Sequence, residues 1–249
     1  MNTAITPNHS VLLLGGTGRT GGRVLKQLLD RGVAVRAIVR SASRLPEGVT
    51  GHPGLTVLEA DVLSLSREEM LEQVRGCDAV ISCLGHRTDL KGIFGAPHEL
   101  VAPMVERACA AAAAVRPTEP IKVILMSTVA VHRSGGLDER RGAAGRAFMG
   151  ILRALVPPAK DNQDAADFLI EHVDTESPFV QWVAVRPDTL VEGDVSEYAL
   201  HESIVSSLAK PDDTNMANVA HFMCELVTEP AVWHAWQGKL PVIVNAARA

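Results

Sequence analysis

Apolar residues along the chain follow two different spacings. Short unbroken apolar runs, typical of buried strands, alternate with longer segments in which apolar residues recur every three or four positions, as in amphipathic helices. The predicted strands are residues 10–14, 33–39, 55–59, 79–84, 121–126, 179–185 and 240–244. The predicted helices are residues 19–31, 66 to about 75, 98–116, 160–173, 197–208 and 215–227.

This alternation of strands and helices predicts an α/β fold. Strand–helix–strand units joined by right-handed crossovers build a doubly wound parallel sheet of the Rossmann type. The run 121–126 is continuous in apolar and β-branched residues, as expected for a central strand covered by helices on both faces. Ser66, followed three residues later by Glu69, forms a capping-box pattern that marks a helix start. Because open α/β sheets commonly reach this size, residues 1–249 are expected to form one domain.

Three regularly spaced glycines, Gly15, Gly18 and Gly21, lie between the first strand and the first helix. Glycines here allow a tight turn and let the backbone approach a pyrophosphate, while the helix N-terminus presents free N–H groups to the anion. The loop of phosphate-binding NTPases would end in Gly-Lys-Ser/Thr, whereas Gly22 and Arg23 follow here, which argues against ATP or GTP hydrolysis. The loop therefore predicts a dinucleotide site. The residues assigned to it are Gly15, Thr17, Gly18, Arg19, Thr20 and Gly21.

The end of the second strand indicates which dinucleotide is bound. Proteins that prefer NAD usually carry Asp or Glu there, about 20 residues after the glycines, to hold the ribose hydroxyls. This strand ends instead in Arg40 and Ser41, which match a 2′-phosphate. Arg19 in the loop offers a second guanidinium, which binds phosphate oxygens in bidentate fashion. NADP(H) is therefore the predicted cofactor, with solvated surface charges as the alternative interpretation of the arginines.

Composition and charge exclude several other classes of function. The net charge of −5 gives no global positive field for nucleic acid or anionic lipid. No apolar stretch reaches the roughly 18 residues of a membrane span, and the first ten residues lack a signal-peptide pattern, so a cytoplasmic location is expected. The four cysteines and nine histidines show no metal-ligand spacing, so no metal site is predicted.

The chain resembles the atypical short-chain dehydrogenase/reductases, specifically the NmrA-like and biliverdin-reductase-B-like NAD(P)-binding proteins. The resemblance covers nearly the whole chain. The motifs that carry it are Gly15-Gly16-Thr17-Gly18-Arg19-Thr20-Gly21, Val39-Arg40, Ala60-Asp61-Val62, Cys83-Leu84-Gly85, Met126-Ser127-Thr128, Lys160-Asp161 and Val185-Arg186-Pro187.

The resemblance implies further cofactor contacts. Asp61 and Val62 would lie against the adenine, with Asp61 bonding its amino group, although an aspartate that caps a turn is an alternative interpretation. The backbone of Cys83, Leu84 and Gly85 would pass beside the nicotinamide ribose, and Pro187 with Arg186 would contact the carboxamide. Each of these segments follows a predicted strand, on the edge where open α/β sheets bind ligands.

The catalytic residues are less clearly indicated. Family members with full dehydrogenase activity carry Tyr-x-x-x-Lys, but Val156 stands four residues before Lys160, and the single tyrosine is Tyr198. Lys160 either reaches the cofactor ribose or the substrate, as in atypical relatives, or is an exposed lysine. Ser127 and Thr128 either bond a substrate oxygen or satisfy local backbone. His132 either donates a proton or is an ordinary loop histidine.

These observations predict an NADPH-dependent oxidoreductase that transfers hydride to a small organic substrate: a carbonyl, an imine, a conjugated double bond or a flavin. Two alternatives remain open: a non-catalytic NADP(H)-sensing regulator or scaffold, and an epimerase or isomerase that uses bound NADP. Substrate-region segments are expected near 133–158 and 188–215. The residues expected to line the substrate pocket, 87–95, 133–150 and 188–203, form no recognisable constellation, and the oligomeric state stays open.

Overall fold

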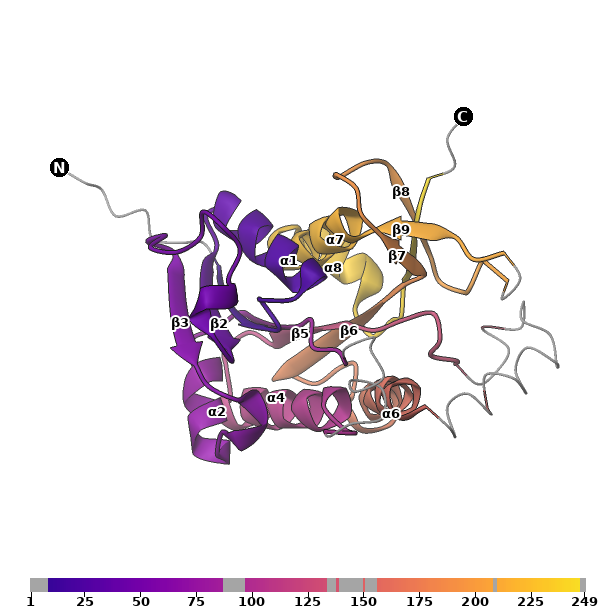
Figure 1. Ribbon diagram of the computed structural model, residues 1–249. Coiled ribbons are helices and arrows are strands. Elements are labelled where there is room, and N and C mark those ends of the chain that lie inside the picture. Colours follow the sequence, from indigo (N-terminus) through magenta and orange to yellow (C-terminus); the bar gives the residue numbers. More distant parts are fainter. Residues whose placement is uncertain are drawn as a thin grey trace.

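The computed structural model describes residues 9–86, 97–133, 138, 150, 156–207 and 210–246. Its centre is an eight-stranded sheet with the order β3-β2-β1-β4-β5-β6-β10-β8 (Figure 1). Neighbouring strands are parallel, except that β8 pairs antiparallel with β10 at one edge. The strands are β1 (Ser10–Leu14), β2 (Ala34–Val39), β3 (Leu55–Glu59), β4 (Ala79–Ser82), β5 (Ile121–Met126), β6 (Val180–Pro187), β8 (Tyr198–His201) and β10 (Val242–Asn245).

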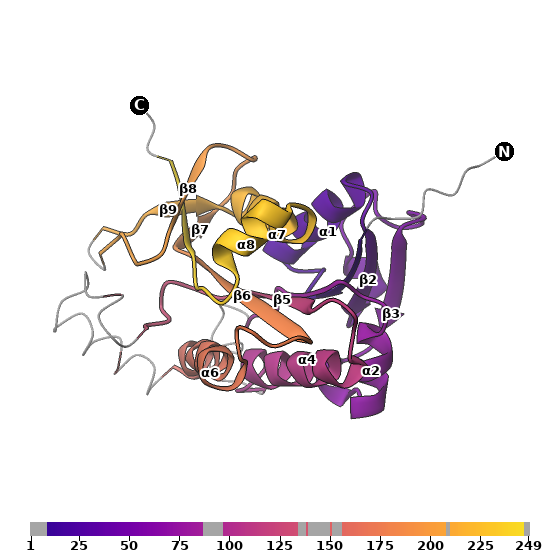
Figure 2. The same ribbon diagram turned by 180° about the vertical axis from the view of Figure 1, so that it is seen from behind.

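Helices cover both faces of this sheet, as Figures 1 and 2 show. One face carries α1 (Arg19–Asp30), α7 (Met216–Thr228) and α8 (Pro230–Trp236); the other carries α2 (Arg67–Val74), α4 (Val101–Val115) and α6 (Pro157–His172). The central strands are therefore buried on both sides, and Val11 to Leu14 of β1 have no exposed surface. This two-sided burial explains why the strand runs are continuously apolar rather than alternating.

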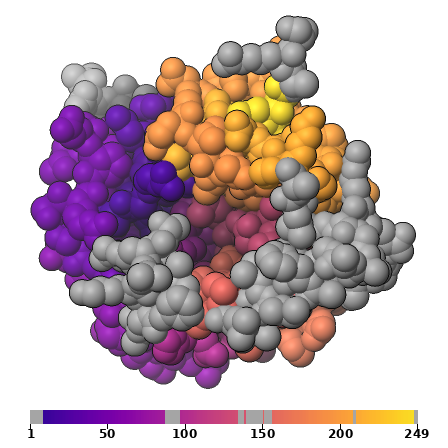
Figure 3. Space-filling view, turned by 45° about the vertical axis from the view of Figure 1, so that its right-hand side comes forward, coloured from indigo at the N-terminus to yellow at the C-terminus, as the bar shows by residue number. Residues whose placement is uncertain are grey.

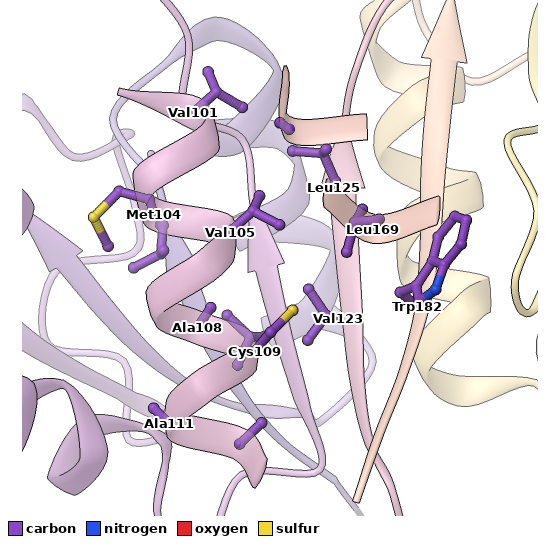
Figure 4. Close-up of a cluster of buried hydrophobic side chains, with 14 of the residues drawn as sticks. Val101, Met104, Val105, Ala108, Cys109, Ala111, Val123, Leu125, Leu169 and Trp182 are labelled. Carbon is purple, nitrogen blue, oxygen red and sulfur yellow. The ribbon is translucent and has the colours of Figure 1, made fainter. Parts of the chain in front are cut away.

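The core under α4 shows why the small residues of this helix matter. Val105 of α4 points toward Val123 and Leu125 of β5, whereas Met104 of the same buried cluster points to the other side of the helix (Figure 4). Further along the helix the buried residues are small, which lets its axis lie close to the sheet. These small residues are Ala108, Cys109, Ala111 and Ala112. Leu169 of α6 and Trp182 of β6 complete this layer of the core.

The helix predicted at residues 197–208 is wrong. Residues Tyr198–His201 form strand β8, which pairs with β10 in the register Leu200 to Ile243. Tyr198 and Leu200 pack against the core beside α7, whereas Ala199 packs against a separate small cluster with Val242 and Val244. Side chains alternate between two surfaces here, so tertiary packing at the sheet edge overrides the helical spacing of the segment.

The other predicted strands and helices are confirmed, with ends that differ by a few residues. The capping box is present: Ser66 Oγ accepts from Glu69 N at 3.1 Å, and Glu69 accepts from Ser66 N at 2.7 Å. Besides two 3₁₀ turns, Ala42–Arg44 and Val62–Ser64, three short elements of the described residues were not predicted, because they are too brief to show a period. They are α8 and the small parallel pair β7 (Thr189–Val191) with β9 (Asp213–Asn215).

The two expected substrate-region segments differ in how far they are described. Most of 133–158 lies outside the described residues, as does 87–95. Residues 188–215, apart from 208–209, contain β7, β8 and β9 and lie beside the C-terminal end of β6. None of the helices in the described part of the chain is long and apolar enough to cross a membrane.

Candidate functional site

The strand order places a crevice between the ends of β1 and β4. The chain proceeds from β1 outward to β2 and β3, then returns to β4 on the other side of β1. Helices leave these two strands toward opposite faces, which leaves open space at their carboxyl ends, where α/β proteins bind ligands. The glycine loop follows β1, and Cys83 to His86 follow β4, so both segments meet at this crevice. Figure 3 shows the face on which indigo, magenta and orange segments come together.

The glycine loop packs too tightly for side chains at two of its positions. A Cβ on Gly15 would lie 2.6 Å from the carbonyl oxygen of Cys83, and Gly15 also has a φ of +82°. A Cβ on Gly21 would lie 2.2 Å from the carbonyl oxygen of Gly15. The start of α1 therefore lies directly against the turn after β1, an arrangement that only glycine permits.

The first turn of α1 has unsatisfied donors that suit an anion. Gly18 is the N-cap and has no side chain, so no side-chain cap bonds the first N–H groups. No acidic residue lies in this turn. Arg19 is two-thirds exposed, with Nη1 4.0 Å from Glu192 Oε1, and Arg23 also pairs with Glu192. Thr20 is buried, whereas Thr17 is partly exposed. The helix start thus presents N–H donors without a side-chain cap or a nearby carboxylate of its own first turn, which suits an anion.

The end of β2 carries hydroxyls and a cation and no carboxylate. Arg40 is exposed, and Ser41 Oγ lies 3.0 Å from Ser43 Oγ. Glu59, at the end of β3, accepts from Ala42 N at 2.7 Å and so holds this turn. The β1–β2 register pairs Leu14 with Ile38, which places Arg40 on the same sheet edge as the glycine loop.

Asp61 and Val62 follow β3, as the resemblance implied, but both have structural contacts. The Asp61 carboxylate caps the short 3₁₀ turn Val62–Ser64 by accepting from Leu63 N at 3.1 Å. The Val62 side chain is buried in the core on the α4 face. The capping interpretation of Asp61 is therefore realised in the structure.

A cavity of about 360 Å³ lies over the carboxyl ends of β4 and β5, beside the glycine loop. It is bounded on its far side by the start of α6. Its walls are largely apolar, with a few polar groups, which is typical of small-molecule sites. The lining residues are Leu84, Gly85, His86, Met126, Ser127, Thr128, Val156, Pro158, Ala159 and Asn162.

Ser127 and Thr128 are placed together at the cavity, but their hydroxyls differ. The Ser127 hydroxyl is buried and has no hydrogen-bond partner among the described residues, whereas Thr128 Oγ1 accepts from Ala130 N at 3.2 Å. A buried unpaired hydroxyl costs free energy unless a ligand or water completes it. Ser127 is therefore the residue of the two that fits a ligand oxygen.

Lys160 does not join these residues. Its side chain is 59% exposed and pairs with Asp164 one helical turn further on, an ion pair that raises the pKa of Lys160. The cavity is lined instead by Pro158, Ala159 and Asn162 of the same helix. The exposed-lysine interpretation matches this position, because the side chain pairs with Asp164 outside the cavity lining.

Tyr198 and His132 also lie apart from the cavity lining. The Tyr198 hydroxyl, on β8, donates a hydrogen bond to Glu225 at 2.6 Å. Burial of Tyr198 raises the pKa of its hydroxyl most, and the hydrogen bond to Glu225 raises it further. His132 is held through its backbone by Gln163, in two bonds of 2.9 and 3.0 Å.

The end of β6 has a structural role that the sequence did not indicate. Pro187 is buried, and its carbonyl oxygen accepts from Val129 N at 3.1 Å. Arg186 has no exposed surface and lies 2.8 Å from Asp138, itself fully buried. Both residues therefore tie the end of β6 to neighbouring segments.

His86 and Asn162 line the cavity but were not singled out in the sequence, and Asp161, which was named only as part of a motif, holds His86. His86 Nε2 lies 2.8 Å from Asp161 Oδ2, and the two side chains are 5% and 0% exposed. An ionisable residue just after Gly85, at the carboxyl end of β4, was a signal that could have pointed to His86. The described residues contain no group of His, Cys, Asp and Glu suited to a metal ion.

Comparison with known proteins agrees with this geometry. A family model described as NAD(P)H-binding matches residues 15–230. An uncharacterized chloroplastic protein of Arabidopsis thaliana is 39% identical over 79 residues, 31% of this chain and 28% of that protein. The uncharacterized protein YwnB of Bacillus subtilis is 34% identical over 73 residues, 29% of this chain and 30% of its own. These matches span less than a third of either relative.

Solved structures share the fold along nearly the whole chain. A putative NADH-flavin reductase of Streptococcus pneumoniae has a TM-score of 0.65 at 16% identity, covering 95% of this chain and 99% of its own. ChuY, an anaerobillin reductase of Escherichia coli, has a TM-score of 0.66 at 16% identity, and the match covers 96% of this chain and 98% of ChuY. A short-chain dehydrogenase/reductase of Veillonella parvula in complex with NADP has a TM-score of 0.67 at 12% identity, and the match covers 96% of this chain and 95% of that protein. With the family model matching most of its length, the chain belongs to the NAD(P)H-binding family, and it has the Rossmann fold.

Proposed function

We propose that the protein is an NADPH-dependent reductase of small organic substrates. The observation that carries this proposal is the cavity at the ends of β4 and β5, adjoining the glycine loop and lined by the unpartnered Ser127 hydroxyl. When bound, NADPH supplies a hydride from C4 of its nicotinamide. The chain binds the pyrophosphate with Gly15, Thr17, Gly18, Thr20 and Gly21, and its cavity orients the substrate.

The substrate is a carbonyl, a conjugated double bond or a flavin. The Ser127 hydroxyl donates to the substrate oxygen or nitrogen that becomes more basic on reduction. Leu84 and Gly85 pass beside the nicotinamide ribose, while Met126 and Val156 exclude water from the reacting atoms. The test is a panel of aldehydes, enones and free flavin with saturating NADPH. Oxidation of NADPH by at least one of these substrate classes supports the proposal. If no class oxidises NADPH, the proposal is contradicted.

The preference for NADPH over NADH rests on the turn after β2. Arg40 and the Ser41 hydroxyl stand where a carboxylate would hold the ribose hydroxyls of NAD. Replacing Arg40→Asp is expected to raise the Kd for NADPH about tenfold to a hundredfold, because a charge-assisted hydrogen bond of about 1.5–3 kcal/mol is lost. The Kd for NADH should change less than about threefold. Fluorescence titration with each cofactor measures both constants.

A matched control is Arg67→Asp, which makes the same charge change at the exposed start of α2. It should leave both constants within about twofold, because exposed charges far from the ligand are screened. Tighter binding of NADH than NADPH by the unmodified protein would contradict the cofactor assignment, as would equal losses in the two variants.

A second candidate, an NADP(H)-sensing protein without catalysis, is favoured by one observation. Neither Tyr198 nor Lys160 lines the cavity, so the acid pair of active short-chain dehydrogenases is not assembled. Such a protein would bind NADP⁺ and NADPH tightly and oxidise NADPH with no acceptor of the panel. The panel experiment therefore distinguishes the two functions directly.

A further inference from the structure

We infer that His86, held by Asp161, is the proton donor and acceptor of this site, in place of the absent tyrosine. The inference rests on the proposed reductase function. Of the described residues that line the cavity, His86 alone carries a titratable side chain. His86 and Ser127 line the same cavity, and the imidazole is held against α6 by its contact with Asp161.

The carboxylate of Asp161 is fixed from three other directions. It accepts hydrogen bonds from Leu100 N at 2.9 Å, Val101 N at 2.7 Å and Ala102 N at 3.0 Å, at the start of α4. Asp161 thus connects α6 with the N-terminal end of α4 and cannot turn toward another partner without breaking these bonds. Because the same oxygen, Oδ2, lies 2.8 Å from His86 Nε2, the position of the imidazole is fixed as well.

This arrangement determines which ring nitrogen is available. Backbone N–H groups only donate, so Asp161 acts as an acceptor toward all of its neighbours, and His86 Nε2 must carry the hydrogen. The exchangeable proton is then the one on Nδ1. A carboxylate that holds one nitrogen of a histidine and leaves the other for chemistry is the arrangement of acid–base histidines in hydrolases.

The proton transfer accompanies reduction of a carbonyl. His86, as imidazolium, gives its Nδ1 proton to the substrate oxygen while the carbonyl carbon accepts the hydride and the C=O π pair moves onto oxygen. The carbonyl is reduced to an alcohol, the nicotinamide is oxidised, and His86 remains neutral with its Nε2–H on Asp161. A solvent proton restores the imidazolium. In the direction of alcohol oxidation, neutral Nδ1 takes the hydroxyl proton.

The first test needs no variant. Nitrogen-15 NMR of protein labelled at histidine should show His86 in the Nε2–H tautomer, and addition of NADP⁺ should shift its Nδ1 resonance. His86→Gln identifies the signal by its loss, and exposed His234 should not respond to NADP⁺. An Nδ1–H tautomer, or a His86 signal that saturating NADP⁺ leaves unchanged, would overturn the inference.

The second test compares two hydride acceptors. Reduction of 4-nitrobenzaldehyde produces a strongly basic alkoxide that needs a proton, whereas FMN leaves as a stable reduced anion. In His86→Gln, whose amide still donates to Asp161, the rate of aldehyde reduction should fall about 100-fold or more. The rate with FMN and the Kd for NADPH should change less than about threefold. His234→Gln is the matched control and should match the unmodified protein.

Equal losses on the two acceptors, or none on the aldehyde, would refute a proton-transfer role for His86 and leave the reductase proposal standing. Failure of the unmodified protein to bind NADPH would instead contradict the reductase proposal itself, whatever the tautomer of His86.

Discussion

Replacing Gly21→Ala is expected to reduce affinity for NADPH by about 100-fold or more. The added Cβ would meet the carbonyl oxygen of Gly15 at 2.2 Å and its carbon at 2.9 Å, both backbone atoms. Cys83 closes the other side at 3.1 Å, so the start of α1 must move away from the loop. The N–H groups that converge on the pyrophosphate then separate, and two charge-assisted hydrogen bonds are worth about 3–6 kcal/mol. Isothermal titration measures the loss.

Gly22→Ala separates this clash from any general effect of alanine in the helix. Its Cβ would meet the ring of Pro46, a side chain, at 2.9 Å, and the backbone atom it approaches most closely, the carbonyl oxygen of Gly16, would lie 3.6 Å away, an ordinary van der Waals contact. Alanine also favours the helix by about 1 kcal/mol over glycine. Affinity within about threefold of the unmodified protein is expected for Gly22→Ala. Similar affinities of the two variants would contradict the role given to Gly21.

The cofactor half of the site was predictable because its signals are local. Gly15, Gly18 and Gly21 lie within seven consecutive residues that span the turn after β1 and the start of α1. The strand and the helix that identify this glycine spacing as a dinucleotide motif are its immediate neighbours in the sequence. The same holds for Arg40, because its predicted role in binding NADP(H) depends only on its position at the end of one strand. Where function depends on consecutive residues at a strand end, periodicity and residue type suffice.

The substrate half was not predictable, because it is assembled by packing. His86 and Asp161 are 75 residues apart in the chain and meet only because α4 and α6 lie side by side. The resemblance to the short-chain dehydrogenase/reductases pointed to Lys160, but which residues of α6 face the cavity depends on how the helix is rotated. Two residues turn a helix by about 200°, so Lys160 and Pro158 point to nearly opposite sides.

The edge strand β8 was missed for a related reason. A short segment with leucine and tyrosine at intervals can satisfy a helical or an alternating pattern, and only its partner decides between them. Here β10 offers an unpaired edge, and Tyr198 and Leu200 gain burial against the α7 face by pairing with it. Sequence periodicity alone contains no information about that partner.

Replacing Asp138→Ala is expected to destabilise the protein by about 3–5 kcal/mol, because it removes one partner of a fully buried ion pair, the carboxylate that lies 2.8 Å from the Arg186 guanidinium. Asp138 also accepts from Arg133 N at 2.9 Å and from Ile204 N at 3.1 Å. It therefore joins the segment after β5 and the segment after β8 to the end of β6, beside the candidate site. Denaturant unfolding measures the loss in the free energy of unfolding.

Asp164→Ala is the matched control, since it removes an aspartate from the exposed pair with Lys160. Exposed ion pairs contribute about 0–1 kcal/mol, so this variant should unfold near the midpoint of the unmodified protein. Comparable losses from the two substitutions would show that burial of the Arg186–Asp138 pair does not govern its contribution.

The loss from Asp138→Ala should also depend on pH. Burial by itself raises the pKa of Asp138, but the hydrogen bond and charge of Arg186, with the two backbone donors, outweigh it and lower the pKa. A carboxyl group with a lowered folded pKa stabilises the fold above its unfolded pKa, about 3.9, and loses this contribution as pH falls through the folded value. The difference in unfolding free energy between the unmodified protein and Asp138→Ala should therefore be constant near neutral pH and shrink below about pH 4. If this difference in unfolding free energy stays constant down to pH 2, Asp138 stabilises the fold by packing alone. If the difference shrinks, the negative charge of Asp138 is what holds Arg186 at the end of β6.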